Sequence, residues 1–392
     1  MFHTPSGRCL VALCFVLRWS ATAAARPFST ATNLEPEEQE INPSFADVDT
    51  YDRCELSEGN YTMSNLSEIW CNSDKRLKIE MNPNSSNSLV LAPGKPVRLV
   101  GKGDQQTKLE FDISLLPGAS LSLEALHLKG RIEVLENEPS TDQSKMSYLK
   151  FVNCSVSPPA PDAKQGALAD LELDGGIRDP FAWRGWLMVR DAALTLEIHN
   201  SHLYGGAFVK QSRNLNLLAS QNSSFDLEGQ SFQLVNVTSH IQLEGVKVHP
   251  QRPEQLHNHP SFHMVLGRHE VHVTSSTFFG SGIEIKEPAD LILDVRGNTQ
   301  FHEGQRAIVV TGHEGNSSQV DLQDVKIQDF SEFGVLIKGR ADVKLENIQI
   351  EDAAIGAEIS APHLTVKNVD ISYTDTGIVL EHGEAELEAI KM

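Results

Sequence analysis

The chain has 392 residues, with 53 acidic and 33 basic side chains and a formal net charge of −20 at pH 7. An acidic chain without basic clusters is a poor partner for nucleic acid or for an anionic membrane surface. Hydrophobic residues make up 40% of the chain, enough for one long core, and no stretch after the N-terminal segment is apolar enough to span a bilayer.

The N-terminal segment has the layout of a secretory signal peptide. Residues 1–32 contain no acidic residue, Cys9–Leu17 is a short apolar run, and Ala21–Ala25 offers a small-residue cleavage site. A mitochondrial transit peptide is the alternative, because Arg18, Arg26 and the segment Arg26–Ala31, which reads RPFSTA, are typical of one. We predict a signal peptide over residues 1–25.

N-glycosylation sequons support export through the secretory pathway. Asn-x-Ser/Thr occurs more often than chance predicts, at Asn60, Asn65, Asn84, Asn153, Asn222, Asn236 and Asn316. We therefore expect a secreted or cell-surface glycoprotein.

Two short segments precede the main fold. Residues 26–53 are acidic and read as an extended linker, and residues 54–74 as an N-terminal cap region. Cys54 and Cys71 enclose a short loop, so an oxidising compartment would favour a disulfide between them; two free thiols are the alternative. Cys154 falls at an apolar position of the repeat described below, which predicts a buried, unreactive thiol.

From about residue 75 the chain repeats. Apolar residues recur at offsets 0, 2, 5 and 7, most clearly in four C-terminal copies that begin at Val320, Val343, Leu364 and Ala385. Offsets 0 and 2 share one face of a strand, offsets 5 and 7 share a face of a second strand, and the odd step between them indicates a bend. A third apolar pair follows after Gly334, Gly356 or Gly377.

The repeat extends well upstream and predicts roughly a dozen coils. Gaps of about two periods contain degraded copies around Leu171, Leu215 and Leu291. A fresh copy ends at Met392, which predicts that the solenoid continues beyond the given C-terminus.

One insertion and one histidine-rich segment interrupt the repeat. Residues 157–190 hold aromatic and polar planar side chains that suit a sugar ring, although the tryptophans could equally pack the loop onto the core. The candidate ligand-binding residues are Trp183, Trp186, Phe181, Arg184, Asp174 and Asp179. The segment from His249 to His272 matches no established zinc spacing and reads as a polar surface loop, so no metal site is predicted.

The outward positions of the last coils carry alternating charges. Offset 1 runs Asp321, Lys344, Thr365 and Glu386; offset 3 runs Gln323, Glu346, Lys367 and Glu388. Alternation suits charge pairing between neighbouring strands and supplies no pair of carboxylates for acid and base catalysis.

The strand pairs with their bends, together with segments such as Gly377–Leu380 and Gly282–Ile285, resemble the right-handed parallel β-helix, or pectin-lyase-like, superfamily. The resemblance covers residues 75–392 and implies an all-β fold, a single solenoid with a period of 21–28 residues. A leucine-rich repeat is the competing solenoid, but the connecting segments lack helical periodicity.

The predicted function is a binding or structural module with a glycan or matrix polysaccharide as ligand. The first alternative is a polysaccharide lyase or glycoside hydrolase, since the superfamily includes both; the second is a purely structural segment of a larger surface protein. We expect no catalytic residue to be identifiable and no cofactor, with calcium if the protein were a lyase. Substrate and oligomeric state do not follow from the sequence.

Overall fold

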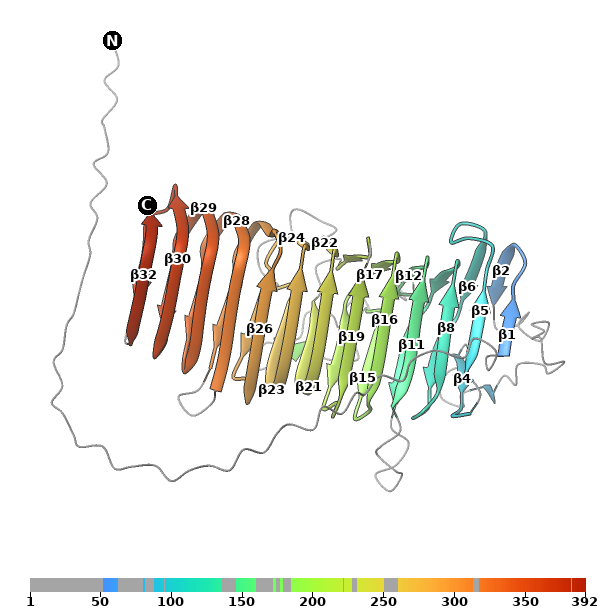
Figure 1. The fold of residues 1–392 in the computed structure, drawn as a ribbon. Helices are drawn as coiled ribbons and strands as arrows, with labels where there is room; N and C mark the ends of the chain where they lie inside the picture. The colour runs from blue at the N-terminus through green and yellow to red at the C-terminus, as the bar shows by residue number, and fades with distance from the viewer. Residues whose placement is uncertain are drawn as a thin grey trace, which may run out of the picture. The chain divides into compact units, whose positions relative to one another are not determined.

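The computed structural model of the chain describes residues 52–62, 80–81, 88–94, 96–135, 146–159, 172–173, 177–178, 185–220, 222–227, 231–249, 260–312, 317–381 and 383–392. All regular structure in these residues is β-strand. The described part belongs to one compact unit, residues 47–392. Its strands stack in order from β1 to β32 as a parallel β-helix, which confirms the predicted fold class (Figure 1).

The first wall of the β-helix carries the candidate site described below. Twelve parallel pairings join its successive described strands. They are β1 (Asp52–Glu55), β5 (Val97–Val100), β8 (Ser120–Glu124), β11 (Ser147–Val152), β16 (Leu194–His199), β19 (Leu215–Ser220), the second parts of β21 (Phe232–Glu244) and β23 (Phe262–Thr274), β26 (Asp290–Arg296), the first parts of β28 (Ser317–Lys338) and β29 (Ala341–Ser360), β30 (His363–Ser372) and β32 (Glu384–Lys391).

The second wall follows the first after a bend in every coil. Its strands are β2 (Gly59–Thr62), β6 (Thr107–Glu110), β9 (His127–Lys129), β12 (Ser155–Ser157), β17 (His202–Tyr204), β20 (Ser224–Asp226), β22 (Lys247–His249), β24 (Thr277–Phe279), the first part of β27 (Thr299–Thr311), the middle parts of β28 and β29, and the second parts of β30 and β32, which continue past the bend from the first wall.

The third wall closes each coil. It contains β4 (Ser88–Leu91), β7 (Asp112–Leu115), β10 (Ile132–Leu135), β15 (Leu187–Arg190), β18 (Ala207–Lys210), the first parts of β21 and β23, β25 (Ile283–Lys286), the last parts of β27, β28 and β29, and β31 (Thr376–Leu380). The short β3 (Glu80–Met81) pairs antiparallel with β4, and β13 (Glu172–Leu173) with β14 (Ile177–Arg178).

The predicted inward positions form the core. Val320, Leu322, Val325 and Ile327 are each at most 2% exposed, and the corresponding residues of the next two coils are also buried. Aromatic rings stack along the same interior, with Phe278 and Phe301 4.7 Å apart. Each coil therefore buries its apolar pairs against its neighbours, as a solenoid requires.

The bends between the first two walls have a common conformation. Asp324, Asn347 and Asn368 adopt φ values of 52° to 56°, which Asn and Asp tolerate better than most residues. Asn347 Nδ2 donates to Asp324 Oδ1 at 2.8 Å, and Asn368 Nδ2 donates to Asn347 Oδ1 at 3.1 Å. The bend residues thus continue the stacking with their own side-chain ladder.

Two boundaries differ from the prediction. The β-helix begins with β1 and β2, upstream of residue 75, because Asp52–Glu55 and Gly59–Thr62 pair in parallel with β5 and β6. Leu171 lies outside the described residues, and no coil separates β11 from β16 among the described strands of the first wall, because these two strands pair directly. The two-period gap there arises from an insertion between β12 and β15. The copies at Leu215 and Leu291 do form coils, in β19 and β26.

The last strand leaves its core positions uncovered. Leu387 is 46% exposed and Met392 65%, since among the described strands β32 pairs with β30 alone. The continuation of the solenoid beyond Met392 stays a prediction.

Candidate functional site

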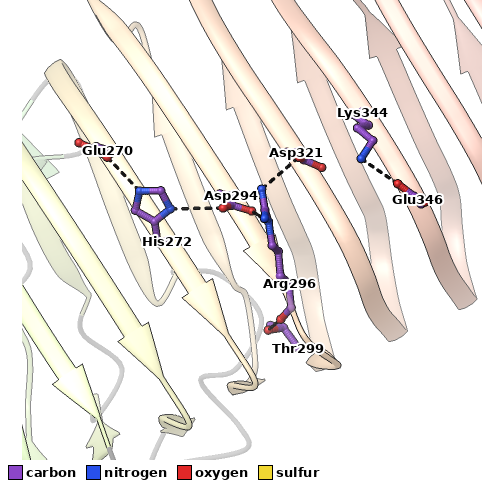
Figure 2. Close-up of polar contacts among 8 residues, drawn as sticks. All are labelled: Glu270, His272, Asp294, Arg296, Thr299, Asp321, Lys344 and Glu346. Atoms are coloured by element: carbon purple, nitrogen blue, oxygen red, sulfur yellow. Dashed lines mark hydrogen bonds and ion pairs between the residues drawn. The ribbon is translucent and has the colours of Figure 1, made fainter. Parts of the chain in front are cut away.

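A polar ladder lies on the outer face of the first wall, from β23 to β29. Val271 and Val273 point inward on β23, so the alternation of the strand turns Glu270 and His272 outward. The same alternation turns out the polar residues of the next strands. The polar ladder consists of Glu270, His272, Asp294, Arg296, Asp321, Lys344 and Glu346 (Figure 2).

Asp294 is the centre of the polar ladder. His272 Nδ1 lies 3.3 Å from Asp294 Oδ2, and Arg296 Nε donates to Asp294 Oδ1. The Arg296 guanidinium also reaches the next coil, where Nη2 lies 3.3 Å from Asp321 Oδ2 (Figure 2). One arginine therefore connects carboxylates from two adjacent coils.

A modified bend places Arg296. Gly297 and Asn298 both adopt positive φ, 67° and 62°, where the regular coils use a single such residue. The hydroxyl of buried Thr299 donates to the Arg296 carbonyl at 2.6 Å and fixes the start of this bend. The additional residue shifts the apolar positions after the bend by one, which is why the copy at Leu291 appears degraded in the sequence.

The ladder continues to β29. Asp294 and Asp321 side chains are only 18% and 15% exposed, and Lys344 Nζ lies 2.7 Å from Glu346 Oε2. The hydrogen bond to Glu346, with the nearby Asp321 charge, raises the pKa of Lys344, and the same bond lowers the pKa of Glu346. The contact between Lys344 and Glu346 therefore holds both side chains ionised. A general acid must instead carry a proton that it can give up.

The predicted charge alternation is present, with a mixed pattern of pairing. Arg296 with Asp321, and Lys367 with Glu388 at 3.9 Å, are pairs between strands, whereas Lys344 pairs with Glu346 on its own strand. Such half-exposed pairs contribute little to stability individually.

Three potential metal ligands meet at the β21 end of the ladder. His240 Nδ1 lies 3.1 Å from Glu270 Oε2, and His272 Nε2 lies 3.0 Å from Glu270 Oε1. One ligand atom from each of these residues lies within 4.8 Å of the others. The hydrogen bond from His272, above all, lowers the pKa of Glu270.

The structure corrects the prediction that Trp186, in the insertion, is a ligand-binding residue. Its side chain is 1% exposed and meets Phe151 edge to face at 5.7 Å, so it belongs to the core and offers no surface to a sugar. The other candidates, Asp174, Asp179, Phe181, Trp183 and Arg184, lie outside the described residues.

Four described histidines of the histidine-rich segment lie on strands. His249 ends β22, and His263, His269 and His272 lie on β23; His269 is 3% exposed, with Nε2 2.7 Å from the Leu266 carbonyl oxygen. The expectation of a polar surface loop is therefore wrong for these four residues, because they belong to strands. His257 and His259 lie outside the described residues.

The cysteines and sequons are placed as follows. Cys154 is 1% exposed and burial raises the pKa of its thiol to about 12, as predicted for an unreactive cysteine. Cys54 is buried, but Cys71 lies outside the described residues, so their disulfide stays a prediction. Among the described sequon asparagines Asn60, Asn153, Asn222 and Asn236 are exposed; Asn65, Asn84 and Asn316 lie outside the described residues.

Sequence reasoning missed His240, Glu270, Asp294 and Arg296. The template fits β21 and β23, with Ile241 and Val271 at its first position, but the outward residues were compared only in the last four coils, and the two-residue bend after Arg296 does not fit. The usable signal was the pairing of His240 with Glu270 in register, one residue before those two positions.

Comparisons with protein-family models, curated proteins and solved structures found no match for this chain. Within the part of the chain that the structure describes, no helix has the length and apolar character needed to cross a membrane.

Proposed function

We propose that the protein is a secreted, glycosylated β-helix that binds a linear glycan or matrix polysaccharide along the outer face of its first wall. The observation that carries this proposal is the polar ladder, in which Asp294, Asp321 and Lys344 occupy one row in three successive coils. We further propose that the fold is of the pectin-lyase-like kind.

The spacing of this row suits a polymeric ligand. Neighbouring parallel strands lie about 4.8 Å apart, a distance comparable to the length of one sugar residue in an extended chain. Carboxylates, an imidazole and a guanidinium together offer acceptors and donors to successive hydroxyl groups. Because the strands fix these side chains, little conformational entropy would be lost on binding.

The contacts favour binding over catalysis. His272 and Arg296 contact Asp294, and Arg296 also contacts Asp321. A glycosidase needs two carboxyl groups free to flank the scissile bond, whereas Asp294 and Asp321 are both engaged by Arg296.

A polysaccharide lyase or glycoside hydrolase remains the second candidate, on a specific observation. Asp294 and Asp321 are adjacent carboxylates in one row with an arginine between them and a lysine beside them. Calcium would then be the cofactor to test, since carboxylate oxygens are its usual ligands.

Export and glycosylation rest on the sequence, with support from the surface position of the described sequons. Asn60, Asn153, Asn222 and Asn236 are exposed, as an attached glycan requires. Mass spectrometry of protein secreted from eukaryotic cells, before and after glycosidase treatment, would test this part of the proposal.

A polysaccharide array tests the binding function. The full chain is applied with and without calcium, and each spot is analysed for released oligosaccharides. We expect retention without products, and retention weakened at least about tenfold by Arg296→Ala, since a hydrogen bond to a charged group contributes about 1.5 to 3 kcal/mol.

Lys338→Ala is the matched control. Lys338 pairs with Glu358 at 2.5 Å on the third wall, so its loss removes a comparable ion pair away from the ladder. If both variants weaken retention equally, the first wall is not the binding surface. Released oligosaccharides would establish the enzymatic candidate instead.

A further inference from the structure

The cluster of His240, Glu270 and His272 has the side-chain types and the spacing that a metal ion requires. His272 Nδ1 faces Asp294 at 3.3 Å while its Nε2 faces Glu270 at 3.0 Å. A neutral imidazole carries a single N–H, so it can donate to only one of these carboxylates. The other nitrogen then faces a carboxylate oxygen, which is repulsive unless a second proton or a metal ion lies between them.

The strands present all three residues to the same point. His240 on β21 stands directly opposite Glu270 on β23, and His272 lies two residues further along the same outward face. The rings of His240 and His272 are 5.7 Å apart between centroids, and the three ligand atoms lie within 4.8 Å of one another. A small movement of these three side chains toward one another, on strands that stay fixed, would bring their ligand atoms to one ion.

The surroundings supply the second layer of contacts that metal sites usually have. A histidine that binds metal through one nitrogen commonly donates the other N–H to a carboxylate, which fixes its orientation. Asp294 occupies that place for Nδ1 of His272, and Arg296 in turn holds Asp294. Nε2 of His272 is thereby directed toward Glu270 and His240.

We propose that His240, Glu270 and His272 bind one zinc ion. Two imidazole nitrogens and one carboxylate oxygen are a ligand set typical of a zinc site that keeps its fourth position open. Glu270 is 46% exposed and His240 40%, so the fourth position faces solvent and can take water or an oxygen atom of a ligand. The site shares Glu270 and His272 with the polar ladder, but zinc binding does not depend on the proposed glycan function and can be tested without any glycan.

Zinc binding to the purified full chain tests the site directly. The chain is stripped with a chelator and titrated with zinc chloride in a calorimeter at pH 7.5, and a separate metal-free sample is titrated with cobalt as a spectroscopic probe of tetrahedral coordination. We expect one equivalent to bind. His240→Ala, Glu270→Gln and His272→Ala should each weaken this event by at least about 100-fold, and Asp294→Asn by about 10- to 100-fold.

His363→Ala is the matched control. His363 is an exposed histidine on the first wall, in the strand that pairs with β29, and its removal should leave zinc affinity unchanged. Melting curves of the zinc-free variants show whether each is folded. The proposal is overturned if the folded chain binds no zinc, or if binding survives all three ligand substitutions.

Discussion

The coils from β28 to β30 and the coils from β21 to β27 share a fold but differ in their regularity. In the former, one bend residue per coil, Asp324, Asn347 or Asn368, adopts a positive φ, and the outer face carries lysine and glutamate in alternation. In the latter, the coil of β26 and β27 has two bend residues of positive φ, Gly297 and Asn298, where the coils of β21 and β23 have Gly245 and Ser275 singly. Histidines occupy the first wall of these coils. Repetition thus accounts for the core, while the departures from it gather the unusual side chains.

The largest effect should come from breaking the core of a regular coil. Leu345 is 1% exposed, and Leu345→Asp would place an unpaired carboxylate in the interior. We expect a loss of more than about 4 kcal/mol in the free energy of unfolding, measured by chemical denaturation. An unchanged melting temperature would mean that the inward face is assigned to the wrong side of the strand.

Buried His269, on β23 in the irregular coils, should make the free energy of unfolding depend on pH. Burial lowers the pKa of His269 from 6.5 to about 4, although the hydrogen bond to the Leu266 carbonyl opposes this shift. As the pH falls, His269 therefore gains a proton in the unfolded chain before it does so in the folded chain. The stability that is present above pH 6.5 is lost as the pH falls toward 4.

The expected loss from His269 is at most about 3 kcal/mol over this window. Denaturation at several pH values should show a shallower decline for His269→Gln than for the wild type. Parallel curves would show that His269 does not titrate differently in the two states.

The glycines that stack before the third strand of successive coils, such as Gly356, should tolerate no side chain. A Cβ on Gly356 would lie 2.6 Å from the Gly377 carbonyl oxygen and 2.8 Å from Ile371 Cγ2, too close for real atoms. Gly356→Ala should cost about 1 to 3 kcal/mol because the coils must shift apart. At Gly312 the nearest atom, the Lys338 oxygen, is 3.9 Å away, so Gly312→Ala should be far milder. Thermal melts of the two variants test this explanation. Equal losses of stability would show that coil spacing is not the cause.

The outward face should matter least to stability. Lys344 is 44% exposed and its partner Glu346 is 29% exposed, so solvent screens their attraction. Lys344→Ala should cost less than about 1 kcal/mol in the same denaturation experiment. A loss close to that of Leu345→Asp would indicate reversed faces.

The fold was accessible from the sequence because the core repeats. Offsets 0, 2, 5 and 7 identify buried residues such as Val320 and Ile327 without any knowledge of pairing, since strand alternation and a single bend residue determine them. The glycines before the third strand pair were also recognisable, because neighbouring coils stack at that corner.

The site was not accessible in the same way. His240 and Glu270 are neighbours only because β21 pairs with β23 across an intervening insertion, and the two-residue bend after Arg296 hides Asp294 from the template. Trp186 was misjudged for a related reason, since an aromatic residue in an insertion can fill a gap in the core as well as face solvent. Pairing of strands, rather than local pattern, decides these cases.

The most direct test of glycan binding by the irregular coils is a pair of dissociation constants. The polysaccharide best retained on the array would be titrated into Arg296→Ala and into Lys367→Ala, whose lysine lies on β30 beyond the polar ladder. We predict that Arg296→Ala weakens binding at least about tenfold and that Lys367→Ala has little effect. Equal effects, or a loss confined to Lys367→Ala, would contradict the assignment of binding to these coils.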